Sequence, residues 1–522
     1  MKKVLIYDCT LREGAQSEGI SYSVSDKLQI AKALDAFGVA YLEAGNPFSN
    51  PKDIEFFEKA AKLDLKNVKL CAFGSTRRKN LSADKDENIA SLLRANTPCI
   101  AIFGKCSKLH IEQILGVSEK ENLDMVYDTV SYLVSKGKEV IFDAEHYYDA
   151  YRENSECVLK VLSAAKEAGA SFLCLCDTNG GTLPEEIERI TRETIAAVPG
   201  NYAVHCHNDC GCAVASSLSA VNAGAVMLQG TFIGIGERCG NADLSVLIPN
   251  LMLKKGYDCG VKDLTKLTDL AGMLYELSNH PTPNDKPYVG RSAFAHKGGM
   301  HIDAMMKNPV SYEHIAPEEV GNKRRFLMSE VSGRTMLLAK IASFAPELKK
   351  DDEKTLRIMA KVKELEHIGY QFETADASFE LMARNILGTF KPHFKLKMYK
   401  TSGEKPSQGE SAYAMLRIEV DGKEETAAAF GTGPVHALDL ALRKALTVFY
   451  PELKKVRLTD YKVRVLASNQ AAASTVRVLI ESTDGINVWT TVGVSTDIIE
   501  ASFIALVDSI EYILLKNQLI NK

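Results

Sequence analysis

The chain has 522 residues, 46% of them hydrophobic, and a formal net charge of -4. This length exceeds what one core usually supports, so we expect at least two domains. The charge balance gives no basic stripe for nucleic acid, no apolar stretch is long enough to span a bilayer, and 12 cysteines are too few for a disulfide scaffold. We therefore expect a cytoplasmic protein without nucleic-acid or membrane partners.

The first half of the sequence alternates short apolar runs with longer segments of helical periodicity. Helices are expected at 24–37, closed by Gly38, and at 155–168, closed by Gly169. Eight β/α units predict an α/β fold, a closed (β/α)8 TIM barrel, with an open doubly wound sheet as the alternative. The expected strands occupy residues 4–9, 40–44, 68–73, 99–103, 139–144, 172–176, 202–207 and 227–233.

The repeating pattern stops after about Leu277. Three prolines within residues 279–291 indicate a linker, and helical patterns then resume to about Leu365. We therefore predict a TIM-barrel catalytic domain in residues 1–277 and helical linker subdomains in residues 278–390.

The tail contains two similar units. Each has two strand patterns joined by an Asp-Gly turn, at 421–422 and at 484–485, and each then continues into a helix. The units lack clustered His, Cys or carboxylate groups. The sequence therefore predicts a C-terminal α+β domain, residues 391–522, made of two β-hairpin/helix repeats with a regulatory or dimerisation role.

Polar residues gather where the expected strands end. His205 and His207 are two apart on a strand, so their side chains share a face and that of Cys206 points the other way. Two imidazoles and a carboxylate suit a divalent ion, and Asp8 ends the first strand. We predict a metal site of Asp8, His205 and His207, with Asn241 as a further oxygen ligand. The alternatives are satisfied core histidines and an Asp8 that only caps a turn.

Three further strand-end residues are candidates for binding a substrate. Arg12 could stabilise a developing enolate or hold a carboxylate in bidentate fashion. Glu145 and Thr178 could bond a substrate carboxylate or hydroxyl, or could instead support the metal ligands. A lone loop arginine could also be only a solvated charge.

Three motifs in chain order carry a family resemblance. Together they resemble the isopropylmalate, homocitrate and citramalate synthase family, within the metallolyase TIM barrels, and the stretches 19–24, 49–53, 289–301 and 458–465 are most similar to its citramalate branch. The similarity runs through nearly the whole chain. The motifs are Asp8-x-Thr10-Leu11-Arg12-x-Gly14-x-Gln16, His205-x-His207-Asn208-Asp209 and Gly234-x-Gly236-Glu237-Arg238-x-Gly240-Asn241.

The resemblance implies an acyltransferase that condenses acetyl-CoA with a small 2-oxo acid. In the citramalate branch the acid is pyruvate, the products are citramalate and CoA, and the pathway is isoleucine biosynthesis. A divalent metal (Mg, Mn or Zn) would act as a Lewis acid on the keto group. The resemblance implies catalytic roles for Arg12 and Glu145, and substrate binding by Arg12, Glu43, Glu145 and Thr178.

The resemblance also implies a homodimer. In the family, an acid/base histidine from the linker acts in the partner subunit's active site, and His301 matches this histidine. The resemblance also implies that Tyr312 is a second catalytic residue and that Asp303 binds substrate. The tail resembles a regulatory domain that binds an end-product amino acid, for which isoleucine is the candidate. A purely structural dimerisation module is the alternative.

Rival functions remain open at this point. The same barrel could condense acetyl-CoA with another 2-oxo acid, as isopropylmalate synthases do, or could cleave acyl-CoA substrates as a metal-dependent lyase or aldolase. A non-catalytic amino-acid sensor is a further alternative, although a scaffold would have no need of costly buried polar groups.

Overall fold

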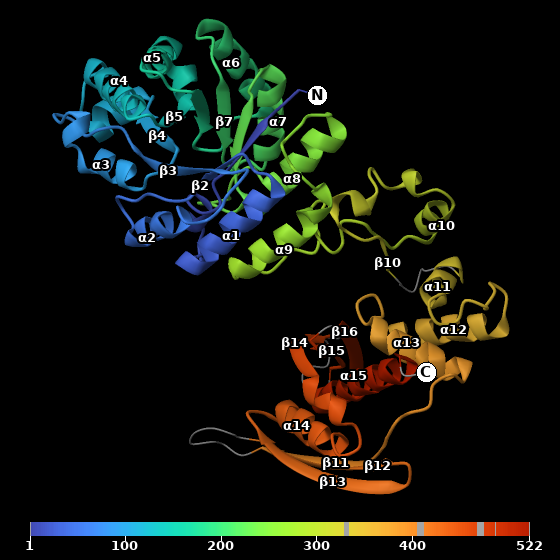
Figure 1. Ribbon diagram of the computed structural model, residues 1–522. Coiled ribbons are helices and arrows are strands. Elements are labelled where there is room, and N and C mark those ends of the chain that lie inside the picture. The colour runs from blue at the N-terminus through green and yellow to red at the C-terminus, as the bar shows by residue number, and fades with distance from the viewer. Residues whose placement is uncertain (1, 328–333, 404–411, 467–473, 486, 521–522) are drawn as a thin grey trace. The chain divides into compact units, whose positions relative to one another are not determined.

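The computed structural model describes residues 2–327, 334–403, 412–466, 474–485 and 487–520. The chain forms two compact units, one of residues 1–294 and 314–324, the other of residues 295–313 and 325–522. Figure 1 shows both. Among the helices of the described ranges, none combines the length and the apolar character needed to cross a membrane.

The first unit is a closed barrel of eight parallel strands, which confirms the predicted TIM barrel. Strand β8 pairs with β1 and closes the sheet, with Met227 opposite Leu5. The expected eighth strand is too long, because Ile233 has a φ of 60° in a 3-10 turn that follows β8. The strands are β1 (Leu5–Asp8), β2 (Tyr41–Glu43), β3 (Lys69–Ser75), β4 (Cys99–Lys105), β5 (Glu139–Glu145), β6 (Phe172–Asp177), β7 (Tyr202–Cys206) and β8 (Met227–Gly230).

Helices cover the outside of the barrel (Figure 1). Helix α1 has the predicted bounds because Ser23 and Asp26 form a capping box and Gly38 ends the helix in the left-handed region. Helix α5 begins earlier than expected and contains a kink at Asn154. The helices are α1 (Val24–Phe37), α2 (Pro51–Ala60), α3 (Glu87–Arg94), α4 (Glu119–Ser135), α5 (Tyr147–Glu167), α6 (Pro184–Ala197), α7 (Ala213–Ala223), α8 (Leu244–Pro249) and α9 (Leu267–Leu277).

Two apolar layers follow from the alternation of side chains along the strands. One layer packs between the strands and the helices. The other fills the barrel and includes several thiols and aromatic rings. The interior is therefore a packed core, and the polar groups at the carboxyl ends of the strands stand above it.

The first part of the second unit is mainly helical. Its core includes Ile302, Leu337 and Phe379. Strand β9 (Ala295–His296) pairs with β10 (Arg325–Phe326). The helices are α10 (Gly299–Lys307), α11 (Arg334–Ile341), α12 (Glu353–His367) and α13 (Asp376–Leu387).

The tail forms two similar modules, each a three-stranded antiparallel sheet with a helix packed on it. The predicted hairpins and helices are present, but each sheet gains a further edge strand, β11 or β14. These two strands are largely exposed. Short alternations of apolar and charged residues, Leu396 with Met398 and Tyr461 with Val463 and Val465, were present in the sequence, but the prediction did not use them. The elements are β11 (Lys395–Gly403), β12 (Ala412–Val420), β13 (Lys423–Gly431), α14 (Pro434–Leu446), β14 (Arg457–Val465), β15 (Val476–Thr483), β16 (Val488–Ser495) and α15 (Ile498–Ile520).

Candidate active site

The end of β1 holds a buried carboxylate in a fixed position. Asp8 is fully buried and accepts hydrogen bonds from the backbone N of Thr10 at 2.9 Å and from its Oγ1 at 2.8 Å. Burial raises the pKa of Asp8 to about 7, despite these hydrogen bonds. Each carboxylate oxygen keeps a second lone pair, so Asp8 can still act as a ligand.

Arg12 lies in the turn that follows β1, between two carboxylates. Its guanidinium forms ion pairs with Glu13 and Glu43 and lies over the ring of Phe73, 3.8 Å from the ring centre. Burial opposes the charged form, but the carboxylates of Glu43 and Glu13 outweigh it and raise the pKa of Arg12. Glu43 is itself buried and accepts a hydrogen bond of 2.7 Å from Tyr7. Arg12 is therefore a fixed, permanent cation.

The two predicted histidines lie side by side at the end of β7. Their ring centres are 5.1 Å apart, and both rings are buried. Nδ1 of His205 contacts Oε1 of Gln229 at 3.0 Å, and Nε2 of His207 is 3.9 Å from Oε1 of Glu13. Burial lowers the pKa of His207 to about 3. Burial also lowers the pKa of His205. Both shifts favour the neutral imidazole, which is the form that binds metals.

Several polar atoms at and near these histidines are buried without a hydrogen-bond partner. Within the described residues, Nδ1 of His207, Oδ1 of Asn241 and Oε1 of Glu13 are buried without a hydrogen-bond partner. Residues His207 and Asn241 also form an isolated backbone bridge, which holds them together. Unsatisfied buried polar atoms cost free energy unless a ligand or ion completes them. The chemistry of these donors thus suits a divalent cation, but Asp8, His205 and His207 do not bring one ligand atom each within 4.8 Å of one another.

A cavity of about 320 Å³ opens over these groups. The predicted residues Arg12, Glu145, Thr178, His205 and His207 line it, whereas Asp8, Glu43 and Asn241 do not. Glu145 forms an ion pair with Lys105, and Thr178 accepts a hydrogen bond of 2.8 Å from the backbone N of His146. The lining holds two arginines, Arg12 and Arg238, and the four carboxylates Glu13, Asp143, Glu145 and Glu237. An anionic substrate would therefore depend on Arg12 and on a bound cation beside the histidines.

The remaining predicted residues belong to the second unit. The rings of His301 and Tyr312 stack with centres 4.3 Å apart, and both side chains are exposed. Asp303 pairs with Lys307 at 2.7 Å. The stack forms a compact pair of titratable groups on α10 and the turn that follows it.

A second cavity, of about 500 Å³, lies at the ends of β3 and β4. Its described lining carries four cations, no carboxylate and several apolar side chains, and it shares Phe103 with the first cavity. The cations are Arg77, Arg78, Lys79 and Lys105.

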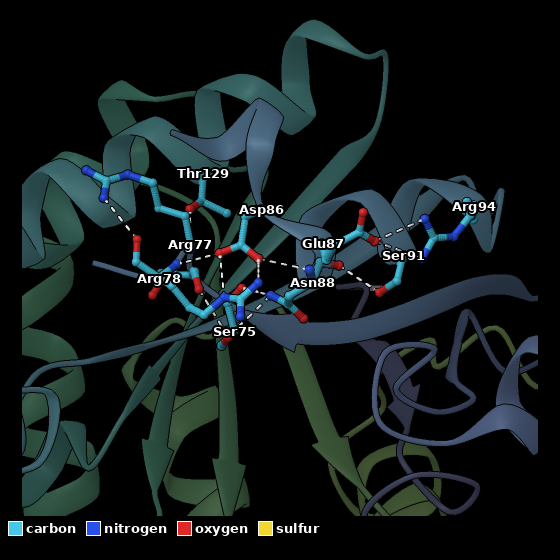
Figure 2. Close-up of polar contacts among 10 residues, drawn as sticks. Ser75, Arg77, Arg78, Asp86, Glu87, Asn88, Ser91, Arg94 and Thr129 are labelled. Carbon is cyan, nitrogen blue, oxygen red and sulfur yellow. Dashed lines mark hydrogen bonds and ion pairs between the residues drawn. The ribbon is translucent and has the colours of Figure 1, made fainter. Parts of the chain in front are cut away.

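The loop after β3 is built around a buried carboxylate (Figure 2). Asp86 accepts hydrogen bonds from the backbone N of Arg78 at 2.7 Å and of Asn88 at 2.9 Å. The backbone N of Arg77 donates to Oγ1 of Thr129 at 2.8 Å. The basic residues are therefore held in place by the fold.

Comparison with known families divides the chain into three matches. The HMGL-like family model covers residues 3–274, a homocitrate synthase post-HMGL domain-like model covers residues 288–369, and a LeuA allosteric (dimerisation) domain model covers residues 373–514.

Full-length relatives decide the family. The chain is 49% identical to an (R)-citramalate synthase of Aquifex aeolicus and 47% identical to one of Geobacter sulfurreducens, and 99% of each chain is covered in both comparisons. The chain belongs to the (R)-citramalate synthase family. Among solved structures, a Bacillus subtilis HMG-CoA lyase matches 54% of this chain and 96% of its own, with 23% identity and a TM-score of 0.47.

Several site residues of this family member were not predicted from the sequence. Glu13 follows Arg12 directly but is an unspecified position of the first motif, so its only signal was a carboxylate beside the candidate arginine at the end of β1. Phe73 and Gln229 gave none, because an aromatic or amide residue within an apolar strand resembles any core position. Only the closed barrel brings Gln229 beside His205 and Asp143.

Proposed function

We propose that the chain is an (R)-citramalate synthase: it joins the acetyl group of acetyl-CoA to pyruvate and releases citramalate and CoA. The observation that supports this proposal most is that Arg12, His205 and His207 line one cavity. Buried ligand atoms of His207 and Asn241 have no hydrogen-bond partner among the described residues. Full-length relatives of 47–49% identity bear the corresponding name. The choice of pyruvate over a larger 2-oxo acid is part of the proposal.

The residues that would hold a divalent metal are Asp8, His205, His207 and Asn241. When bound, the metal supplies Lewis-acid polarisation of the keto oxygen. Mg, Mn and Zn all suit this mixture of nitrogen and oxygen donors.

The charged groups of the cavity have separable tasks. Arg12 holds its guanidinium where an oxygen gains negative charge, since Glu13 and Glu43 fix its position. Glu145 and Thr178 orient the 2-oxo acid from β5 and β6, and Glu43 supports binding through Arg12. Glu145 is also our candidate for moving a proton, because it lines the cavity while paired with Lys105.

We propose that the linker of one subunit completes the partner's site in a homodimer. His301 would act as the acid/base group, Tyr312 would assist it through the ring stack, and Asp303 would bind substrate. The LeuA dimerisation model over residues 373–514 supports a dimer. The division into residues 1–277, 278–390 and 391–522 belongs to this proposal.

We propose that the basic cavity receives the phosphates and adenine of acetyl-CoA. Three of the lining cations are ion-paired with carboxylates outside the lining: Arg77 with Glu121 and Asp128, Arg78 with Asp86, and Lys105 with Glu145. Lys79 donates to a backbone carbonyl, so its charge suits a phosphate group, and the apolar side chains suit a base. Because Phe103 lines both cavities, the thioester end of one molecule can reach Arg12 while its phosphates remain near Lys79.

We also propose an isoleucine effector for the tail, as the end product of the pathway that citramalate begins. The allosteric domain model supports a ligand there. The cytoplasm is the proposed location, and the free thiols at the barrel mouth, Cys210, Cys212 and Cys239, suit a reducing compartment.

CoA release tests the function directly. Purified protein with Mg or Mn is given acetyl-CoA and pyruvate, 2-oxobutyrate, 2-oxoisovalerate or 2-oxoglutarate. We expect pyruvate to dominate and (R)-citramalate to be the product. Preference for a larger acid would refute only the substrate, whereas no CoA release with any acid would refute the condensation and favour a lyase.

A further inference from the structure

Two thiols and a carboxylate lie together inside the barrel. Cys174 and Cys176 are two residues apart on β6, so both point inward, and Asp143 is opposite Cys174 on β5. One ligand atom from each residue lies within 4.8 Å of the others, and all three are buried. We propose that Asp143, Cys174 and Cys176 form a second metal site, selective for a thiophilic divalent cation such as Zn²⁺ or Cd²⁺.

The spacing of the sulfurs fits tetrahedral coordination. The two Sγ atoms are 4.0 Å apart. A tetrahedral zinc with Zn–S bonds of about 2.3 Å places two sulfurs about 3.8 Å apart, so binding needs a shift of only a few tenths of an ångström. Within the described residues, no other set of three His, Cys, Asp or Glu side chains brings one ligand atom each this close together.

The chemistry of the trio differs from that of the first site. Thiolates favour zinc and cadmium, whereas the oxygen and nitrogen donors around His207 also accept Mg and Mn. Burial raises the pKa of Asp143 to about 7, so its carboxyl holds a proton in part of the molecules. Binding of one cation replaces the thiol protons of Cys174 and Cys176 and any proton on Asp143, so two or three protons leave to solvent. Each sulfur then donates an electron pair to the cation, the carboxylate of Asp143 donates a third, and no electron is transferred.

The site has an entrance and a route to the candidate catalytic histidines. Asp143 and Cys176 line the cavity of about 320 Å³, so water or substrate can take the fourth position. Oδ1 of Asp143 accepts a hydrogen bond of 3.1 Å from Gln229, whose Oε1 is 3.0 Å from Nδ1 of His205. A cation on Asp143 competes with Gln229 and loosens His205.

We therefore expect Cd²⁺ to inhibit CoA release even when Mg²⁺ is saturating. This inhibition rests on the proposed function, whereas the binding itself does not. A binding experiment thus separates failure of the second site from failure of the condensation.

The test is a Cd²⁺ titration of the full chain, followed by the ultraviolet charge-transfer band of cadmium thiolate. Every variant and the wild-type reference carry Cys210→Ser, Cys212→Ser and Cys239→Ser, which remove the thiols that are not buried. The wild type should bind one Cd²⁺ with this band, and Cys174→Ser should lose it. Asp143→Asn keeps both thiols and should weaken binding about tenfold, which guards against misfolding of the serine variant.

Two matched controls should keep the band. Cys71→Ser removes another barrel thiol, whose sulfur lies 3.4 Å from that of Cys99, and His207→Ala disrupts the first site. The proposal is overturned if Cys174→Ser and Asp143→Asn both bind Cd²⁺ as the wild type does, or if Cys71→Ser is the variant that loses the band.

Discussion

Buried polar side chains have hydrogen-bond partners in the tail modules, whereas several at the barrel mouth have none. In the modules the buried hydroxyls and the indole are satisfied: Trp489 donates to Oγ of Ser509 at 2.9 Å and Thr491 to the carbonyl of Ala505 at 2.7 Å. Over the described part of residues 395–520, no buried side-chain polar atom lacks a partner. At the barrel mouth, His207, Asn241 and Glu13 each have such an atom.

This difference separates groups that hold the fold from groups that await a ligand. A satisfied hydroxyl contributes to stability, and its loss should damage its module. An unpaired buried atom costs stability, so its removal should damage the reaction more than the fold. Five substitutions test this contrast, from the largest expected effect to the smallest.

His207→Ala should reduce CoA release about 10³-fold or more and leave thermal stability nearly unchanged, because the imidazole has little to bond in the apoprotein. Steady-state rates and a melting curve without metal measure the two effects. His367→Ala, at the exposed end of α12, is the matched control. A large loss of thermal stability with normal CoA release would show that His207 supports the fold rather than the reaction.

Arg12→Lys should lower kcat about 10²-fold. Lysine keeps the charge but cannot bond Glu43 and Glu13 at once while stacking on Phe73. Arg94→Lys on α3 changes the same residue type at a largely exposed position and should have no effect. A normal kcat would remove Arg12 from the candidate catalytic groups.

Gly493→Ala should destabilise the second tail module by about 2 kcal/mol or more. A Cβ atom there would lie 1.9 Å from the carbonyl oxygen of Ala501, so β16 and α15 must separate. Hydrogen exchange of the full chain should rise in β16 and α15 and stay constant in the barrel. Gly433→Ala, where a Cβ meets nothing within 4 Å, is the control.

Lys79→Ala should raise the KM for acetyl-CoA about tenfold and leave kcat and the KM for pyruvate unchanged. Its Nζ donates to the carbonyl of Leu115 at 3.1 Å, so the substitution removes a hydrogen bond to the backbone and not an ion pair. Lys166→Ala, at the end of α5, alters an exposed lysine at the opposite end of the barrel. Equal effects of both variants would contradict phosphate binding in the basic cavity.

Asp508→Asn should change the pH dependence of stability in the tail. Burial raises the pKa of Asp508 to about 7 from 3.8. The folded form therefore binds the proton more tightly, and stability falls as pH rises from about 4 to about 7. Because the hydroxyl of Ser378 bonds the carboxylate at 2.6 Å and offsets part of this effect, asparagine should gain about 1 kcal/mol at pH 8 and nothing at pH 4 in urea unfolding. A gain in the free energy of unfolding at pH 4 would contradict the predicted direction of the pH dependence.

Some features of the barrel could be predicted from the sequence, and some features of the tail were missed. Helix α1 was predicted to the residue, because its capping signals lie within the helix and next to it. His205 and His207 were placed together because strand alternation is local. The edge strands β11 and β14 were missed, although apolar and charged residues alternate over part of each. Both strands are largely exposed, and only their pairing with β12 and β15 establishes them.

The sequence by itself determined the eight β/α units, the polar strand ends and the duplicated tail, because periodicity, caps and turns act over a few residues. Only the tertiary structure decided that Gln229 links His205 to Asp143, that Lys79 and Lys105 line one cavity, and that Cys174 and Cys176 face a carboxylate. These contacts depend on the register of strands far apart in the chain, which closure of the barrel sets.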